Sequence, residues 1–144
     1  MADDDNLPAR PAVEERGELT LELGGASMSL RPSYEAIVGF EAATGKGLLQ
    51  LAREALNGRL TLAETAQVAC ECVRAWGREA GDQNAAGSNA KKVAKLILEA
   101  EGGLHATLQT VSAMLSLAVT GGYDASGEAK PSAMTTTAKA PVDG

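Results

Sequence analysis

The sequence predicts an α+β domain that is mostly helical: an N-terminal two-stranded β-hairpin followed by about five α-helices in a small bundle. Apolar and polar residues alternate on both sides of Gly24-Gly25, which is the period of half-buried strands. From Arg31 onward, apolar residues recur at spacings of three and four, which is the period of helices. Aromatic residues make up only 3% of the 144 residues, so aliphatic side chains must build most of the core.

The folded domain is expected to span residues 17–121, between two disordered ends. Residues 1–16 contain three consecutive aspartates, two prolines and few apolar side chains, so they predict an acidic, disordered arm. Residues 122–144 are rich in Ala, Ser, Thr, Pro and Gly and predict a disordered tail, because they cannot bury enough surface to become ordered.

The expected hairpin pairs Glu18–Leu23 with Ala26–Leu30. If Gly24-Gly25 forms a two-residue turn, the apolar side chains of both strands lie on one face of the hairpin. These side chains are Leu19, Leu21, Leu23, Ala26, Met28 and Leu30. Two strands are not stable alone, so the helices that follow must cover this face.

The first helix is expected from Pro32 to about Ala43, with Pro32 at its first position, where the missing N–H costs nothing. Its buried side chains are predicted to be Tyr34, Ile37, Val38 and Phe40. Gly45 can adopt the left-handed conformation that ends a helix. A short second helix is expected over residues 46–57, and Gly58 ends it.

Thr61 and Glu64 form a capping-box pattern and predict the start of a third helix, which ends at Gly77 or Gly81. Residues 81–88 are expected to form a loop because of their composition. A fourth helix, capped by Ser88 or Asn89, is predicted to reach about residue 101. After Gly102-Gly103, a fifth helix is predicted from Leu104 to about Val119.

Charge and hydropathy exclude two classes of partner. The net charge is −6, and the one basic cluster, Lys91, Lys92 and Lys95, fits a solvated helix face, so no nucleic-acid partner is expected. The N-terminus is acidic where a signal peptide is basic, and no apolar run approaches the roughly 20 residues needed to span a bilayer. We therefore expect a cytoplasmic protein with no membrane partner.

The residues that could carry chemistry do not form a recognisable site. Cys70 and Cys72 are two positions apart on a helix, so their thiols point roughly 200° away from each other and do not suit a shared metal ion. His105 is the single histidine and has no nucleophile or acid partner in a triad pattern. Glu35 and Glu41 are six apart on one helix and point in different directions.

The segment Thr44-Gly45-Lys46-Gly47 contains a Gly-Lys pair but lacks the other residues of a phosphate-binding loop. It is better explained as the end of one helix and the start of the next. The sequence therefore predicts no catalytic residue, no cofactor and no metal ligand, and a protein that is not an enzyme.

Three segments of the sequence carry a resemblance to a known family. They are Gly17-Glu18 before the alternating hairpin, LRPSYEA at residues 30–36, and FEAATGKGLLQLA at residues 40–52. Together they resemble the gene transfer agent family of phage-type proteins. These proteins are encoded among tail genes of prophages and gene transfer agents, chiefly in alphaproteobacteria, and are classed with phage tail assembly chaperones. The resemblance covers roughly residues 17–80 and weakens afterwards.

The resemblance implies a non-enzymatic chaperone in tail morphogenesis, which holds the tape measure protein or tail tube subunits in the host cytoplasm until assembly. An alternative is a structural virion component, such as a tail completion, connector or tail tube-associated protein. Some family members are labelled tail tube proteins, but two predicted strands are few for a subunit that builds a ring of sheets. An acidic regulatory protein that binds a host factor remains a third alternative.

The apolar stripe of the fifth helix is the predicted partner-binding surface, unless it simply belongs to the core. Its residues are Leu104, Leu108, Val111, Met114 and Leu115. An apolar stripe of this kind can cover a helical client, and the thioether of methionine adapts to different contacts. The open edges of the hairpin provide a second contact, through strand addition or through a homo-oligomer.

Overall fold

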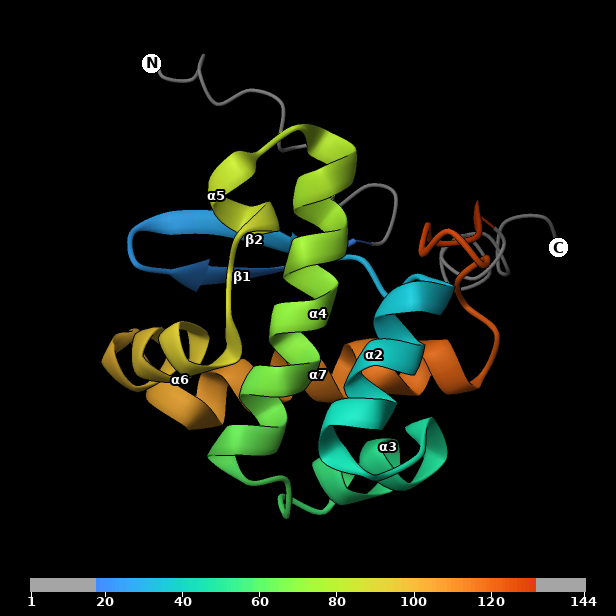
Figure 1. Cartoon of the computed structure of the whole chain (residues 1–144). Helices are drawn as coiled ribbons and strands as arrows, with labels where there is room; N and C mark the ends of the chain where they lie inside the picture. The colour runs from blue at the N-terminus through green and yellow to red at the C-terminus, as the bar shows by residue number, and fades with distance from the viewer. Residues whose placement is uncertain (1–17, 132–144) are drawn as a thin grey trace, which may run out of the picture.

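The computed structural model describes residues 18–131, and its elements confirm the predicted fold class: a two-stranded antiparallel hairpin followed by helices (Figure 1). The elements are β1 (Leu19–Leu23), β2 (Ala26–Leu30), α2 (Tyr34–Thr44), α3 (Leu48–Leu56), α4 (Leu62–Ala80), α5 (Gln83–Ala86), α6 (Ala90–Glu99) and α7 (Gly103–Val119). The predicted arm at residues 1–16 and most of the predicted tail lie outside the described residues.

The hairpin has the predicted register. Leu23 pairs with Ala26, and the two strands continue in step to Leu19 and Leu30. Gly24 and Gly25 have φ values of 60° and 80°, which is the type I′ geometry that fits the twist of the flanking strands. Most of the predicted apolar face is covered: Leu21, Leu23 and Leu30 are buried, Leu19 and Met28 are partly buried against the core, and Ala26 is exposed.

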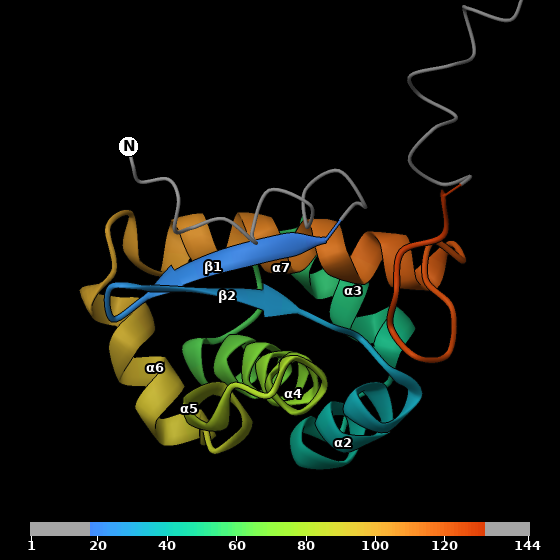
Figure 2. The ribbon, with the colours of Figure 1, turned by 90° about the horizontal axis from the view of Figure 1, so that it is seen from above.

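Helix α4 is the centre of the helical layer. It packs against α2, α5, α6 and β2, while α3 packs mainly against α7. Figure 2 shows the hairpin spread over the helices, with β1 next to α7 and β2 on the side of α4. The largest fully buried side chains come from every layer and are mainly aliphatic: Phe40, Leu23, Leu30, Leu51, Ile97, Met114, Leu115, Val68, Val73, Val93 and Val111.

Local signals set most helix ends. The capping box is complete, since Glu64 N donates to Thr61 Oγ1 and Thr61 N donates to Glu64 Oε1. Gly45 ends α2 with φ 74°, as predicted, and Asn89 rather than Ser88 caps α6. The prediction for Pro32 was wrong by two positions: Ser33 is the N-cap of α2, and its hydroxyl accepts the N–H of Ala36.

The buried face of α2 differs from the prediction. Ala36 and Phe40 are buried, whereas Tyr34 is 66% exposed and Val38 is 45% exposed. Helix α2 lies at the side of the bundle and packs mainly against α4, so only one of its faces is covered. The apolar pattern of the helix did not reveal which face α4 would take.

The segment predicted as a loop at residues 81–88 contains the one-turn helix α5. Asp82 caps it by accepting the N–H of Ala85, and the side chain of Ala85 is completely buried. Gly77 makes this close approach feasible, because a Cβ there would lie 2.7 Å from Ala85 Cβ. Contact with α4 therefore orders a segment whose composition is typical of a loop.

Residues 122–131, which the sequence assigns to the tail, pack on the start of α2. Tyr34 N donates to Ala125 O at 2.9 Å, and Arg31 Nε donates to Ser126 O at 2.9 Å. Tyr123 and Ala129 form a single antiparallel bridge within the segment. A domain boundary at residue 121 therefore leaves out a segment that contacts the domain.

Candidate partner-binding groove

A groove lies between the end of α3 and the first half of α7. It encloses about 430 Å³. Its lining consists of Ala55, Leu56, Gly58, His105, Leu108, Gln109 and Ser112. The lining includes one residue of the predicted partner-binding stripe, Leu108, and several that the sequence did not single out.

The lining of the groove combines apolar and polar side chains. Leu56 is 67% exposed, and Leu108 is partly buried against the core, so both present apolar surface to the opening. Among the polar residues of the lining, Gln109 Nε2 lies 3.4 Å from His105 Nε2, and Ser112 lies one turn further along α7. Protein–protein contacts usually combine apolar side chains with polar groups that can hydrogen-bond, so a lining of this composition suits such a contact.

The apolar stripe of α3 is wider than the surface that its neighbours cover, so apolar surface remains open here. Leu51 and Ala55 face the core and are nearly inaccessible, while Leu49 and Leu56 lie seven positions apart at the exposed edge of the same stripe. Leu49 is 51% exposed. Gly58, with φ 68°, ends the helix and places no side chain at the mouth of the groove.

The five residues of the predicted stripe separate into two groups. Val111, Met114 and Leu115 are completely buried in the core, so a partner could not touch them without opening the domain. Leu104 and Leu108 are partly buried and reach the surface. The spacing that predicts a shared face is correct, but α7 packs mainly against α3 and also contacts α6, α4 and β1, so most of that face is covered.

The contribution of α3 to the surface was not predicted from the sequence. Leu49 and Leu56 repeat at seven residues, and this spacing was available as a signal. It did not distinguish an exposed pair from a buried pair, because Leu49 and Leu56 also fit the apolar stripe of the helix. Only the packing of α3 against α7 shows which leucines stay outside.

The two cysteines are free and buried in α4. Burial raises the pKa of the Cys70 thiol and raises that of the Cys72 thiol much further. Both thiols therefore stay protonated and unreactive at neutral pH. Among residues 18–131, no group of three or more His, Cys, Asp or Glu side chains could hold a metal ion.

The Thr44–Gly47 segment joins α2 to α3 and α4. Lys46 Nζ lies 2.8 Å from Glu54 Oε1 and 2.6 Å from Glu64 Oε2. Glu41 accepts the N–H of Leu48 at 2.8 Å and so caps α3. These contacts give the charged residues of the segment structural roles at helix ends.

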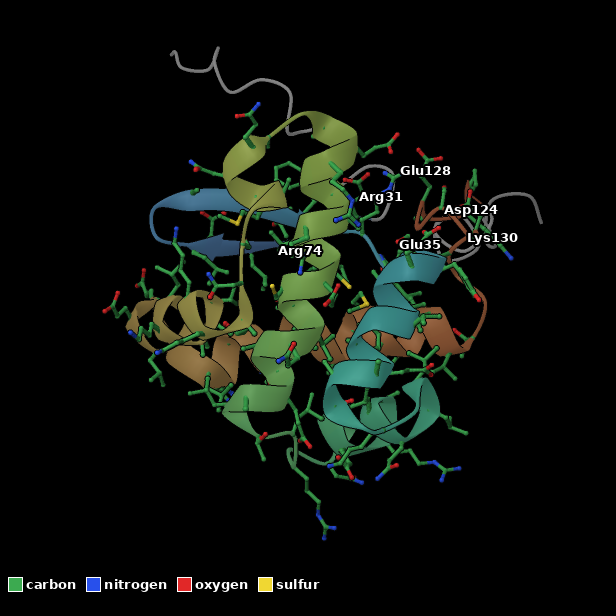
Figure 3. The ribbon with its side chains drawn as sticks, viewed as in Figure 1. Arg31, Glu35, Arg74, Asp124, Glu128 and Lys130 are labelled. Carbon is green, nitrogen blue, oxygen red and sulfur yellow. The ribbon has the colours of Figure 1, made fainter. Side chains whose placement is uncertain are left out.

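A charged corner holds residues 122–131 against the β2–α2 junction (Figure 3). Arg31 Nη2 lies 3.6 Å from Glu128 Oε2, and Asp124 Oδ1 accepts hydrogen bonds from Ser126 and from Glu128 N. The Ser126 hydroxyl is the main reason that the pKa of Asp124 lies below its usual value. The corner is a closed network of local contacts, and we assign it a structural role.

Within residues 18–131, none of the helices combines the length and the apolar character needed to cross a bilayer. A family model described as phage tail tube protein, GTA-gp10, matches residues 16–121. No curated protein and no solved structure shows a significant match. The match confirms the resemblance to phage and gene-transfer-agent tail proteins, but its description names the tail tube and not a chaperone.

Proposed function

Because the chain belongs to the family described as phage tail tube protein, GTA-gp10, we propose that it is a structural component of the tail that associates with the tail tube. The family match over residues 16–121 is the observation that carries this proposal. The role requires binding to other tail proteins and no chemical step. A structural role of this kind is the alternative to a chaperone that the sequence leaves open.

The sheet supports association with the tube rather than formation of its wall. Residues 18–131 contain one sheet, and this sheet has two strands. One of its edges lies against α4. A closed wall of sheets needs strands that continue from subunit to subunit, and this hairpin presents at most one edge for that purpose.

The groove between α3 and α7 is the surface that we assign to a tail partner. Its apolar side chains Leu56 and Leu108 can contact the apolar side chains of a partner helix, spaced at three or four residues. His105, Gln109 and Ser112 in the lining can hydrogen-bond to the partner backbone or side chains. The contact would bury Leu56, which otherwise leaves 67% of its surface in water.

Quantitative mass spectrometry of purified particles tests the proposal. A structural component should be present at a fixed ratio to the tail tube subunit in every preparation. A protein that is abundant in the producing cells but missing from particles would contradict the proposal. Cross-linking within intact particles would then identify the neighbour that touches Leu56 or Leu108.

A chaperone that holds the tape measure protein or tail tube subunits is the second candidate. The observation in its favour is the same groove, since a helical client with apolar stripes would fit it. A chaperone should form a complex with the tape measure protein or with unassembled tube subunits before assembly and be absent or substoichiometric in particles. Co-purification from cells that lack assembled tails, combined with particle analysis, distinguishes the two roles.

A further inference from the structure

The two edges of the hairpin are in different environments. The edge of β2 is covered by α4: Arg31 N donates to Cys72 O at 3.1 Å, and Ser29 is only 1% exposed. In a hairpin closed by a two-residue turn, alternate pairs are hydrogen-bonded, starting from Leu23 and Ala26. The N–H and C=O groups of Thr20 and Glu22 therefore point away from β2.

These outward groups have no partner in the described part of the chain. Within residues 18–131, the backbone of Thr20 and of Glu22 forms no hydrogen bond outside the hairpin. Unpaired groups on an edge strand are a template for another strand. The edge of β1 therefore offers two donors and two acceptors at the spacing of a β-ladder.

A shallow groove runs beside this edge and would receive side chains of an added strand. It encloses about 170 Å³ between Thr20–Glu22 of β1 and Ala106, Thr107 and Thr110 of α7. Figure 2 shows β1 and α7 lying along each other, and the two elements are in contact. The small side chains of α7 leave room for apolar side chains that point from an added strand toward the helix.

The charged residues beside this edge are acidic. Glu22 and Glu101 are the charged residues of the groove lining, and neither Lys nor Arg lines it. Glu22 is exposed and lies on the face of the hairpin opposite the buried leucines. A strand that pairs with β1 would place alternate side chains next to this carboxylate.

We propose that the outer edge of β1 binds an extended segment of another protein, in which Lys or Arg alternates with small apolar residues. The backbone of the segment pairs with Thr20 and Glu22 and adds a third strand to the sheet. Its apolar side chains lie over Ala106 and Thr107, and its basic side chains face Glu22. This site is separate from the groove between α3 and α7, so the inference goes beyond the proposed function.

Charge favours a basic segment over two other occupants of this edge, namely a second copy of the chain and the chain's own residues 1–16. A second copy would bring another Glu22 to the same face of the joined sheet, and like charges on paired strands disfavour that pairing. The chain's own residues 1–16 carry Asp3, Asp4 and Asp5 and two prolines, which cannot donate to a ladder. A separate basic segment fits both the hydrogen-bonding groups and the charge of the edge.

Two capped synthetic octapeptides test the proposal with the full chain in solution. One alternates Lys and Val, and the other alternates Glu and Val. We expect the Lys peptide to bind saturably, to protect the amides of Thr20 and Glu22 from hydrogen exchange, and to bind about tenfold more tightly than the Glu peptide. Equal binding of the two peptides, or binding without protection of these amides, would overturn the proposal.

Two substitutions at one position separate strand addition from other binding. Thr20→Pro removes an outward N–H and leaves the hairpin ladder intact, because Thr20 donates no bond to β2. Thr20→Val keeps that N–H and serves as the matched control. We expect the Lys peptide to bind the Val variant as it binds the unaltered chain and to lose binding to the Pro variant; equal binding to all three contradicts the proposal.

Glu22→Lys gives an independent test in case Thr20→Pro disturbs the hairpin. The variant should bind the Glu peptide more tightly than the Lys peptide, and an unchanged preference would overturn the proposal. Sedimentation of the protein without peptide tests whether a second copy of the chain binds the edge instead, because it measures the oligomeric state. A dimer that Thr20→Pro dissociates would show that a second copy takes the edge, which also overturns the proposal.

Discussion

Lys46 and Glu64 form an ion pair of 2.6 Å between the α2–α3 turn and the first turn of α4. The other carboxylate oxygen of Glu64, Oε1, accepts the N–H of Thr61 at 3.1 Å. Lys46 also contacts Glu54 of α3 at 2.8 Å. One ammonium group therefore joins a helix cap to two further elements of the fold.

Lys46→Met should flatten the pH dependence of stability. The hydrogen bond from Lys46, followed by that from Thr61 N, lowers the pKa of Glu64 from its usual 4.5, and Lys46 also lowers the pKa of Glu54. Carboxylates with lowered pKa values stabilise the fold above about pH 4.5, and this contribution is lost as the pH falls through their folded pKa values. As the pH falls through the acidic range, the melting temperature should fall less for the variant than for the unaltered chain.

Lys91→Met is the control for this experiment, since it removes one positive charge from an exposed position on α6. It should leave the slope of the melting temperature against pH close to that of the unaltered chain. Identical acid profiles for Lys46→Met and the unaltered chain would show that the ion pair does not contribute to stability.

Thr61→Ala should lower the free energy of unfolding by about 1 kcal/mol, since it leaves the N–H of Glu64 without its cap. Denaturant titration measures the change. Thr61→Ser keeps the hydroxyl and should retain most of the stability. An equal loss for both variants would mean that the methyl group of Thr61, and not its hydroxyl, stabilises the start of α4.

Gly77→Ala should cost about 1–3 kcal/mol, because a buried Cβ has no space at this position. It would lie 2.7 Å from Ala85 Cβ and would also clash with Ala86 N. Gly47→Ala is the matched control, since a Cβ there would make an ordinary contact of 3.8 Å with Glu41. Calorimetry should show a marked loss only for the first variant, and hydrogen exchange should show that α5 opens.

The buried thiols should resist modification. Burial raises the pKa values of Cys70 and Cys72, so neither thiolate is populated at neutral pH. A chromogenic disulfide reagent should react slowly with the two thiols of the folded chain. After denaturation it should react rapidly with both of them. Rapid reaction of the reagent with either cysteine of the folded chain would show that α4 opens much more readily than its packing indicates.

Leu56→Glu should weaken binding of a tail partner if the groove between α3 and α7 is the contact surface. The substitution places a charge on an apolar residue of the groove lining, while Leu56 is already 67% exposed, so stability should change little. Leu98→Glu is the matched control, since Leu98 is 61% exposed on α6 and does not line the groove. Co-purification with tail tube subunits compares the two variants.

If the partner binds both variants as tightly as it binds the unaltered chain, the contact lies elsewhere on the molecule. If both variants lose binding, the apolar surface as a whole, and not this groove, holds the partner. Melting temperatures of the two variants should be compared first, because a loss of folding would also remove binding.

Several features could be predicted from the sequence because they depend on residues within a few positions of each other. The Gly24-Gly25 turn sets the register of the hairpin, and Thr61 and Glu64 set the start of α4. Gly45 ends α2 by taking a conformation that other residues rarely adopt. Each of these is a short-range hydrogen bond or a backbone preference, which the local sequence specifies.

The tertiary structure alone decided which apolar residues stay outside. Val111, Met114 and Leu115 share the stripe with Leu104 and Leu108, yet the first three are buried and the other two reach the surface. Tyr34 and Val38 are exposed because α4 covers only one face of α2. Periodicity shows that residues share a face, but burial depends on what packs against that face.

The same reason explains the segment at residues 122–131. Its composition is that of a tail, but Tyr34 and Ala125, which are distant in sequence, share a hydrogen bond of 2.9 Å. Both candidate binding surfaces likewise join residues from separate elements: α3 with α7, and β1 with α7. The sequence by itself determined the elements and their ends, and the packing of elements distant in the chain determined which surfaces a partner can reach.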